Sequence, residues 1–560
     1  MTHRSEGSVG NDRILRVGVL LGSYEQPAWA HQVITEVNAL ETARIVAVLR
    51  ATPRQPSARV STRGTKTAWS HLLYDLHSRW DAHLTKGIPD PLSPCDIGPL
   101  LQSLPEVDVV SRTEGSAEYS SDEDASKAKN CDLDVILSFG FGALQGGVLH
   151  TARYGVWELQ CGSRCENREA PPGFWEVLEQ QGTIEIALRV LTEDVDGGKV
   201  ISRCIASTHP ESVNASRFDC YWKAPSLVVR ALNKLHGDGR QTWLDVPQQR
   251  RPCSNRPHRF PGNRELILPL ARLFGRAAAR RIEYRLFKDQ WFFAFRFRSS
   301  KGDPNNVFHH FKHAIPPKDR FWADPFPVHW EGKYYVFLED ATCRPRKGSI
   351  AVMEIRPDGT YTSPETVIEQ DYHMSYPCIF RHDDSFFMIP ETYANNSIDL
   401  YHCVRFPDQW ELHSTLMSNV KAADATVYEV NGTWWMFVAM ACDGSVPNDE
   451  LFLFHAESPF GPWLPHKNNP VVSDVRCARP AGRPFVWNGK LMRLGQDSSG
   501  GIYGRAISIQ EVLRLTADEY EEREVGRIEP EWAKGLTATH TLNSAGGLTV
   551  IDGSRSILRR

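Results

Sequence analysis

The second half of the chain repeats one short pattern at intervals of about 50 residues. In each unit two short apolar strands flank a tight turn, which is the sequence pattern of a β-hairpin. The turn residue recurs at spacings of 52, 48 and 57 residues: Gly332, Asp384, Gly432 and Gly489. A weaker fifth unit follows around Thr539-His540-Thr541. Blades that bury a core only against their neighbours repeat in this way, so we predict an all-β, five-bladed β-propeller over residues 301–560, with four or six blades as alternatives.

The N-terminal part of the chain, residues 13–248, follows a different pattern. It opens with an apolar strand, a helical stretch and a second apolar strand: Ile14–Leu21, Gln26–Leu40 and Ala43–Leu49. Asp134–Phe139 is another apolar run, whereas the polar segment Ser111–Lys129 is expected to be an exposed loop. Strands that alternate with helices and are apolar throughout are typical of a parallel sheet covered on both faces, so we predict an α/β domain.

A basic segment, residues 249–300, joins the two predicted domains. Between Arg250 and Arg298 it carries 13 Lys or Arg residues and three acidic residues. One face of a helix within it is apolar (Leu270, Leu273, Phe274, Ala277 and Ala278), and arginines occupy another face. Such a helix either packs between domains or lies on an anionic surface, which would give residues 250–298 a peripheral contact with a membrane or glycolipid.

Composition excludes several classes of protein. The chain has 560 residues, a net charge of −4 and 41% hydrophobic residues, which does not fit a disordered protein or one that binds nucleic acid along its whole length. No apolar core suitable for a secretory signal precedes Leu15, so the protein is expected to be cytoplasmic, either free or peripheral at the inner membrane surface. The 12 cysteines are scattered and read as reduced thiols. A zinc site at Cys161 and Cys165 would lack two ligands, so no metal site is predicted.

Two columns of the repeat carry acidic residues in some units and other residues in the rest. Eight residues before the turn, the four clear units have Asp324, Tyr376, Asp424 and Ala481. Seven residues after the turn, they have Glu339, Glu391, Ala439 and Gln496. Both columns fall at strand ends, where a propeller forms a funnel around its axis. A scaffold role would require the carboxylate in every blade. Its presence in some of the blades therefore favours a ligand site.

The chemistry that this acidic set suits is carbohydrate chemistry. A glycosidic bond reacts between one ionised and one protonated carboxyl group, so Asp324, Asp424 and Glu391 are the predicted catalytic residues. The residues predicted to bind substrate around them are Trp322, Glu339, His373, Tyr376, Arg483, Gln496 and Asp497. The alternative is structural: Asp324 and Asp424 would cap turns, and the tryptophans would pack in the core.

Residues 320–525 resemble a known module through several motifs in order: Phe321-Trp322-Ala323-Asp324-Pro325-Phe326, Ser375-Tyr376-Pro377, Pro390-Glu391-Thr392, Ser458-Pro459-Phe460-Gly461-Pro462-Trp463, and Gly495-Gln496-Asp497 with Tyr503-Gly504. They look like the propeller-type domain that precedes the glycosyltransferase domain in plant glucosamine inositolphosphorylceramide transferases. A more distant similarity links them to five-bladed furanosidases and invertases, which implies that Asp324 is a base or nucleophile. No counterpart of the plant glycosyltransferase domain is visible, so the resemblance does not bring its transfer activity.

Residues 14–205 resemble the Rossmann-like fold of methionyl-tRNA and sugar-nucleotide formyltransferases. The segments that show this resemblance are Asp134–Leu137, Arg153–Gln160, Ala170-Pro171-Pro172 with Trp175, and Val195–Gly198. Asp196 matches the family's catalytic Asp, but Glu158 and Gln160 stand where the family has Asn and His. Gln160 cannot titrate, and an ionised Glu158 would repel a developing oxyanion. Formyl transfer from 10-formyltetrahydrofolate is therefore not expected, although Glu158 and Gln160 remain candidates for binding a substrate.

Taken together, these features predict a transferase of glycan or glycoconjugate biosynthesis. It would act on an amino sugar, sugar-phosphate or nucleotide sugar bound in the propeller funnel, by group or glycosyl transfer more than by hydrolysis. Two alternatives remain open: a non-catalytic glycan- or glycolipid-recognition protein with two degenerate domains, and an N-formyltransferase with an altered acid–base set that includes Asp196. No cofactor is predicted, except the 10-formyltetrahydrofolate that this last alternative would need, and nucleic acid is not an expected partner.

Overall fold

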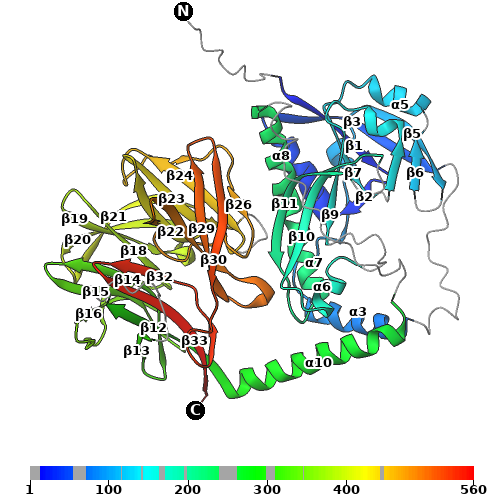
Figure 1. Cartoon of the computed structure of the whole chain (residues 1–560). Helices are drawn as coiled ribbons and strands as arrows, with labels where there is room; N and C mark the ends of the chain where they lie inside the picture. Colours follow the sequence, from blue (N-terminus) through cyan, green and yellow to red (C-terminus); the bar gives the residue numbers. More distant parts are fainter. Residues whose placement is uncertain are drawn as a thin grey trace, which may run out of the picture. The chain divides into compact units, whose positions relative to one another are not determined.

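The structure is a computed structural model that divides into two compact units, Met1–Phe274 and Gly275–Arg560 (Figure 1). It describes residues 13–53, 71–114, 117–120, 122–140, 143–162, 171–193, 198–238, 261–297, 310–344, 346–441 and 447–559. No helix among these residues is long and apolar enough to cross a membrane.

Among the described residues of the first unit, nine strands form one mixed sheet. Across the sheet they follow the order β11 (Lys199–Ser207), β10 (Thr183–Val190), β9 (Val156–Cys161), β7 (Val135–Phe139), β1 (Leu15–Leu21), β3 (Ala43–Pro53), β5 (Glu106–Glu114), β6 (Ala117–Ser120) and β8 (Ala143–Gly146). The helices with it are α1 (Ala28–Asn38), α3 (Leu72–Leu84), α4 (Gly98–Leu101), α5 (Asp122–Lys129), α6 (Phe174–Leu178), α7 (Val213–Trp222) and α8 (Ala224–Asp238). A two-stranded ribbon, β2 (Glu25–Pro27) and β4 (Pro94–Asp96), completes the unit.

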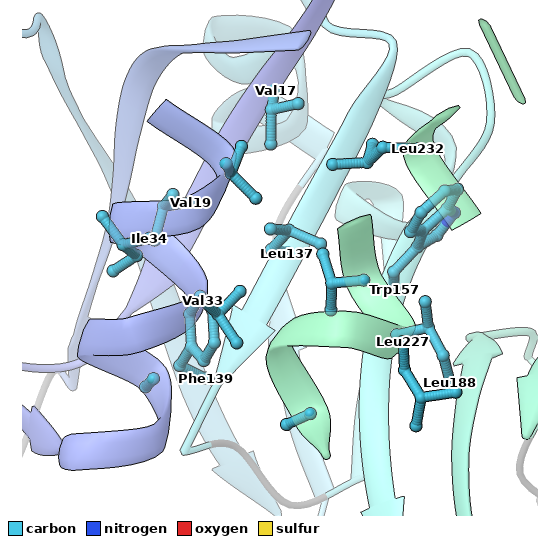
Figure 2. Packing of buried hydrophobic residues seen from close by; sticks show 14 of the residues in the cluster. Val17, Val19, Val33, Ile34, Leu137, Phe139, Trp157, Leu188, Leu227 and Leu232 are labelled. Carbon is cyan, nitrogen blue, oxygen red and sulfur yellow. The ribbon is translucent and has the colours of Figure 1, made fainter. Parts of the chain in front are cut away.

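The central strands are parallel and buried, as the apolar runs predicted. β1 pairs in parallel with both β3 and β7, and β7 with β9. Figure 2 shows Val19 and Leu137 of these strands packed against Val33 of α1 and Leu227 of α8. The buried side chains of α1 recur at spacings of three and four residues, which places them on one side of the helix. This core fixes the carboxyl ends of β7 and β9 next to each other.

The prediction of an exposed loop over Ser111–Lys129 is wrong. The end of β5 pairs antiparallel with β6, β6 pairs in parallel with β8, and α5 follows. These strands lie at the edge of the sheet, where few side chains need to be apolar, so the sequence shows no hydrophobic run there.

The second unit is a five-bladed β-propeller, with one sheet per blade among its described residues. Blade one contains β14 (Arg320–Trp330), β15 (Lys333–Thr342), β16 (Gly348–Ile355) and β17 (Glu365–Ile368), and blade two contains β18 (Ser375–His382), β19 (Ser385–Glu391), β20 (Ser397–Arg405) and β21 (Gln409–Ser418). Blade three contains β22 (Ala422–Val430), β23 (Thr433–Met440), β24 (Glu450–Ala456), β25 (Leu464–Pro465) and β26 (Val472–Ser473), and blade four contains β27 (Phe485–Trp487), β28 (Lys490–Asp497), β29 (Ala506–Leu515) and β30 (Tyr520–Ile528).

Blade five is assembled from segments that are far apart in the sequence. It joins β12 (Phe287–Phe297) and β13 (Lys312–Ala314) to β31 (Leu536–Ala538), β32 (Leu542–Ala545) and β33 (Leu548–Leu558). β12 runs antiparallel to β33 along its whole length, from Phe287 opposite Leu558 to Phe297 opposite Leu548. The propeller ring is therefore closed by a strand that the sequence analysis assigned to the basic segment 249–300, and that assignment of residues 287–297 is wrong.

The rest of that segment contains helix α10 (Asn263–Leu286), which crosses the boundary between the two units. Its buried residues are Leu266, Leu270, Leu273 and Ala277. The first three pack with side chains of α6 and α7. Phe274 and Ala278, which were predicted on the same face, are exposed, so the buried face is narrower and rotated from the predicted one.

We expect the closing blade to be essential for propeller stability, and Phe293 tests this. Its ring on β12 is fully buried beside Phe295 and Trp322. Phe293→Ala should lower the free energy of unfolding by about 3–5 kcal/mol, the usual cost of a buried Phe-to-Ala change. Leu558→Ala is the control, because Leu558 lies on the same strand pair but is exposed, and it should cost at most about 0.5 kcal/mol. Urea unfolding followed by tryptophan fluorescence measures both, and equal losses would contradict the expectation.

Candidate functional site

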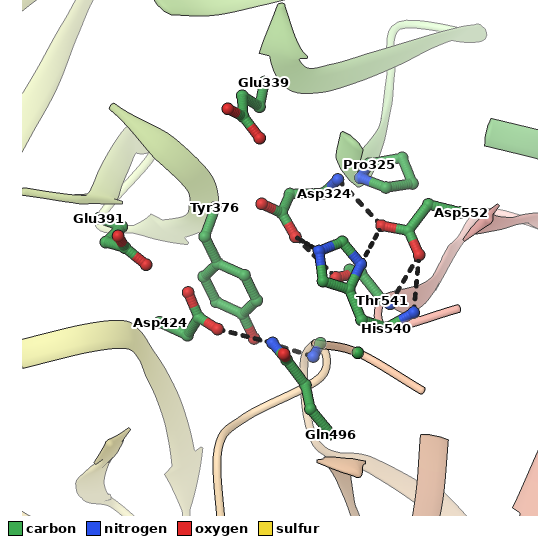
Figure 3. Close-up of polar contacts among 12 residues, drawn as sticks. Asp324, Pro325, Glu339, Tyr376, Glu391, Asp424, Gln496, His540, Thr541 and Asp552 are labelled. Carbon is green, nitrogen blue, oxygen red and sulfur yellow. Dashed lines mark hydrogen bonds and ion pairs between the residues drawn. The ribbon is translucent and has the colours of Figure 1, made fainter. Parts of the chain in front are cut away.

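The first column of the repeat lies at a backbone irregularity that turns its side chains inward. Asp324, Tyr376 and Asp424 have φ angles of +52°, +44° and +55°. Each lies in the register shift of the hairpin that opens its blade, on β14, β18 and β22. Left-handed φ is uncommon for residues other than glycine, and for a bulky residue such as Tyr it costs on the order of 1–3 kcal/mol. Figure 3 shows the ring of Tyr376 between the carboxylates of Asp324 and Asp424.

The second column supplies further carboxyl groups at the same level. Glu339 on β15 pairs with Ala323, the residue before Asp324, and Glu391 on β19 pairs with Ser375, the residue before Tyr376. Because each glutamate is in register with the bulge of its own blade, both columns meet in one cluster (Figure 3). We call the residues Asp324, Glu339, Glu391 and Asp424 the carboxylate cluster.

One guanidinium links two members of the carboxylate cluster. Arg479 donates from Nε to Asp424 Oδ2 at 2.6 Å and from Nη2 to Glu391 Oε2 at 2.9 Å. Gln496 adds a hydrogen bond from Nε2 to Asp424 Oδ2 at 2.7 Å, so the Asp424 carboxylate is held from two sides. Arg479, Asp424 and Gln496 are all buried. Charge-assisted bonds of this kind are strong, and they fix where the two carboxylates point.

His540 connects the cluster to blade five. Its Nδ1 lies 2.6 Å from Asp552 Oδ2, and its Nε2 lies 3.6 Å from Asp324 Oδ1. The Thr541 hydroxyl donates to Asp324 Oδ1 at 2.7 Å, and the backbone N–H of Asp324 donates to Asp552 Oδ2 at 3.1 Å. Asp552 also accepts the backbone N–H groups of His540 and Thr541. Asp324 is therefore oriented by groups that the closing blade provides (Figure 3).

Burial makes these carboxyl groups unusually basic. It raises the pKa of Asp324 to about 6, although the facing His540 opposes the increase. Burial, reinforced by the negative charge of Asp324, raises the pKa of Glu339 well above its usual range. Burial also raises the pKa of Glu391 well above its usual range, in spite of the ion pair with Arg479. For His540 burial disfavours the imidazolium, but Asp552 and Asp324 outweigh it and raise its pKa.

The physical reason is first that burial takes these carboxyl groups out of water, which disfavours their charged form. Repulsion between the neighbouring carboxylates adds to this effect, and Arg479, which pairs with Asp424 and Glu391, opposes it only in part. The cluster therefore offers both an ionised and a protonated carboxyl group, which is the requirement for acid–base work on a bound molecule.

Within the part of the chain that the structure describes, one group of side chains could hold a metal ion. Asp324, His540 and Asp552 present ligand atoms that all lie within 4.8 Å of one another. Carboxylate and imidazole groups suit several divalent cations. In the structure the same atoms face one another directly, so the imidazole already occupies the place between the two carboxylates.

The predicted substrate-binding residues divide into two groups. Glu339, Tyr376 and Gln496 belong to the cluster or contact it, and His373 binds Glu339. Burial, followed by the charge of Arg346, lowers the pKa of His373 to about 4, so the ring is neutral. Its Nδ1 accepts the backbone N–H of Gly348, so its Nε2 carries the proton and faces Glu339 Oε1 at 3.2 Å.

Three predicted residues lie elsewhere, and their assignment to this site is wrong. Trp322 is buried in the propeller core beside Phe293. Asp497 accepts from Arg527 and from the backbone N–H of Ser499, so it orders its own loop. Arg483 donates to the carbonyl of Ile379 further along the blades. In each case the residue is of a type that could bind a sugar, but its position in the blade places its side chain away from the carboxylate cluster.

The predicted site residues do not include Arg479, Tyr503, His540 or Asp552, all of which the structure places at the site. Arg479 did carry a signal, because it stands two residues before Ala481, where the other units have Trp322, Met374 and Ala422. Tyr503 contacts both Arg479 and His540 through its ring and is itself 40% exposed, which places it at the solvent side of the cluster. Asp552 belongs to the fifth unit, whose register was too weak to align.

The candidates in the first unit form a separate group. Glu158 and Gln160 are buried on β9, and Glu158 lies in register with Ser138 of the parallel strand β7. Asp196 and Cys165 lie outside the described residues. Cys161 forms a disulfide with Cys220 of α7, so the expectation that the cysteines are all reduced thiols is wrong at this pair. The bond anchors β9 directly after Gln160.

A known protein family matches the propeller of this chain. Residues 311–544 match the family model described as glucosamine inositolphosphorylceramide transferase 1, N-terminal. This part of the chain is similar to that N-terminal domain. Glucosamine inositolphosphorylceramide transferase 1 of Oryza sativa subsp. japonica is 32% identical over 249 residues, which are 42% of this chain and 33% of the relative. The Arabidopsis thaliana protein of the same name is 31% identical over 209 residues, which are 37% and 27%. The chain thus spans about a third of the length of these relatives.

Solved structures similar to the chain include two glycoside hydrolases. A thermostable family-43 glycoside hydrolase has a TM-score of 0.30 and 14% identity, covering 37% of this chain and 76% of its own. A family 117 glycoside hydrolase from Zobellia galactanivorans has a TM-score of 0.32 and 12% identity, covering 47% and 90%.

Removing the central guanidinium should destabilise the propeller in a pH-dependent way. Arg479→Met leaves Asp424 and Glu391 buried without a counter-charge, which should cost about 3–5 kcal/mol of unfolding free energy at pH 7.5. Burial already raises the pKa of Glu391, and the variant removes the Arg479 charge that opposes this increase, so Glu391 binds its proton more tightly in the folded than in the unfolded state. Stability should therefore rise as the pH falls from 7.5 to 5 and be lost again as it rises.

Urea unfolding at the two pH values measures this effect. Arg479→Lys keeps the charge and should lose less. Arg405→Met removes an arginine paired with Asp408 at the surface and should cause a much smaller loss at either pH. If Arg479→Met lost the same stability at pH 5 as at pH 7.5, the ion-pair role of Arg479 would be excluded.

Proposed function

We propose that the protein acts in glycoconjugate assembly and binds a sugar or sugar-phosphate at the carboxylate cluster for glycosyl or group transfer. One observation carries the proposal: carboxyl groups from three blades meet in one buried cluster, in which Arg479 links Asp424 to Glu391. The relatives' printed names, which specify glucosamine transfer to inositolphosphorylceramide, favour a transferase acting on a glycolipid.

The acid–base roles follow from the environments of the carboxyl groups. Asp324, with a pKa of about 6, is ionised above that pH and would accept the proton of an attacking hydroxyl or amine. Glu391 keeps its proton to higher pH and would donate it to the departing oxygen. Asp424, held by Arg479 and Gln496, would stabilise positive charge that develops on the sugar. Tyr503, exposed beside Arg479, would meet the sugar ring first.

Non-catalytic recognition of a glycan or glycolipid is the second candidate. The bonds from Arg479 to Asp424 and Glu391 favour it, since a carboxyl group held by a guanidinium is less free to exchange a proton. Both candidates predict sugar binding at the same cluster, so product formation is what separates them.

The pH profile of turnover tests the assignment of the two catalytic roles. With UDP-N-acetylglucosamine as donor and an inositol phosphorylceramide as acceptor, product measured by mass spectrometry should follow a bell-shaped curve. The rising limb should fall near pH 6 as Asp324 ionises, and the falling limb should lie above the usual glutamate range as Glu391 loses its proton.

Variants separate the two limbs. Asp324→Asn should reduce kcat by about 10²–10⁴-fold and remove the rising limb, and Glu391→Gln should remove the falling limb. Asp399→Asn is the matched control, because Asp399 is a buried acid that holds Ser397 and Thr415 within blade two, and it should keep both limbs. Sugar binding by calorimetry without any product, in the wild type as in the variants, would favour recognition.

A glycolipid substrate lies in a membrane, and α10 offers a surface that suits an anionic lipid layer. On the side away from its buried residues it exposes Ile267, Ala271, Ala278 and Ile282, spaced so that they share one helical face. The helix carries six arginines and two glutamates, a balance that favours anionic headgroups. The peripheral contact predicted for residues 250–298 is therefore proposed for this face of α10.

Vesicle sedimentation of the full chain tests the membrane contact. The protein should sediment with phosphatidylcholine vesicles containing about 30% phosphatidylserine and much less with pure phosphatidylcholine, because each arginine near the surface contributes about 1 kcal/mol. Ile267→Asp with Ile282→Asp should weaken sedimentation at least tenfold. Val404→Asp, which alters an exposed residue of blade two, should not change it. Equal sedimentation with neutral vesicles would rule out this role of α10.

The resemblance of the first unit to formyltransferases stays a prediction. Formyl transfer to an amino sugar would add 28 Da to the product, a difference that the same mass spectra would detect when 10-formyltetrahydrofolate is supplied. Glu158 would then have to act in place of the family's Asn, from its buried position on β9 in register with Ser138.

A further inference from the structure

A cavity lies in the propeller, away from the carboxylate cluster. Its volume is about 320 Å³, at the lower end of the range of small-molecule sites. Residues of β14, β18 and β19 line it together with Arg483 and the turn after β32. Three large aromatic side chains contribute to its walls: Trp330, Phe380 and Phe386.

A layer of packed side chains separates this cavity from the carboxylate cluster. Tyr376 is fully buried, and its hydroxyl lies 2.9 Å from that of Thr426 and accepts the backbone N–H of Gly482 at 2.8 Å. The ring of Phe326 packs against Tyr376 with the centroids 4.9 Å apart. Along β14, six residues lead from Asp324 in the cluster to Trp330 in the cavity wall, roughly 20 Å of extended strand. The two sites are therefore distinct.

The charged groups that line the cavity are cationic. Arg483 lies over the ring of Phe326 and donates to the carbonyl of Ile379, while its buried Nε has no hydrogen-bond partner among the described residues. Arg381 lies over the ring of Trp330, 4.8 Å from its centroid. Its acidic partner, Asp384, is almost fully exposed and does not line the cavity. Burial lowers the pKa of Arg483, as expected for a cation without a facing carboxylate.

We infer that this cavity binds an organic anion, with its phosphate or carboxylate group held by Arg483 and Arg381 and its apolar body against Trp330, Phe380 and Phe386. Guanidinium groups bind both kinds of anion through paired N–H donors. Rings that already stack with a guanidinium add a flat apolar wall for the rest of the ligand. The site requires neither the carboxylate cluster nor any transfer reaction, so it goes beyond the proposed function.

Calorimetry on the full chain with small probes tests the inference. Phenyl phosphate and benzoate represent the two anionic groups, and at least one should bind at least tenfold more tightly than benzyl alcohol, which has the ring without the charge. Inorganic phosphate, which has the charge without the ring, should also bind at least tenfold more weakly than phenyl phosphate. Arg381→Gln and Trp330→Leu should each weaken binding of the anionic probe about tenfold, since a charge-assisted bond or a buried ring contributes on that order.

Controls separate this cavity from the carboxylate cluster and from loss of folding. Arg483→Lys keeps a cation and should retain part of the affinity, whereas Arg483→Met should lose it, with circular dichroism to confirm that both variants fold. Arg405→Gln, at an exposed arginine of blade two, and Glu391→Gln, in the carboxylate cluster, should leave probe binding unchanged. The inference is overturned if neither anion binds at millimolar concentration, if benzyl alcohol binds equally well, or if Arg381→Gln and Trp330→Leu both leave the affinity unchanged.

Discussion

The ion pairs of Arg479 are the interaction on which the centre of the propeller depends. Four carboxyl groups from three blades lie together out of water, and such an arrangement is unfavourable unless charge is neutralised or protons are retained. Arg479 neutralises part of the charge and fixes Asp424 and Glu391, while His540, held by Asp552, faces Asp324. Burial, together with repulsion between neighbouring carboxylates, still raises the pKa values of Asp324, Glu339 and Glu391. The stabilising network and the chemical capacity of the site therefore have one origin.

A second constraint is the backbone at the inward-pointing residues. Aspartate tolerates left-handed φ better than most residues, so Asp324 and Asp424 suit their positions, whereas Tyr376 does not. The surrounding structure holds Tyr376 there through two hydrogen bonds and the ring of Phe326. The same left-handed backbone recurs at the equivalent position of three blades. We therefore interpret it as the feature that directs these side chains toward the propeller axis, and not as a by-product of folding.

Much of this arrangement could be predicted from the sequence, because the repeat carries it. The turn spacing predicted the blades, and the column comparison selected Asp324, Asp424, Glu339 and Glu391, which do meet. Arg483 and Asp497 were misplaced because a residue type gives no information on which level of the blade it occupies. The fifth blade was predicted from a weak unit only, and its strand β12 was missed because β12 precedes the repeat and has no turn in common with it. Contacts between distant segments leave no local pattern in the sequence. The edge strands of the first unit were missed for another reason: they bury little apolar surface, so their sequence shows no hydrophobic run.

The pairing of β12 with β33 also affects how the propeller can form during translation. β12 leaves the ribosome before any of blades one to four, yet its long hydrogen-bonding partner follows all of them. More than two hundred residues are therefore synthesised before β12 can pair with β33. During that time its apolar side chains, which include Phe292, Phe293 and Phe295, are not buried against this partner. Until then the propeller ring is open, and the unpaired edge of β12 can form hydrogen bonds with other chains. We therefore expect the nascent protein to need a chaperone most during this interval.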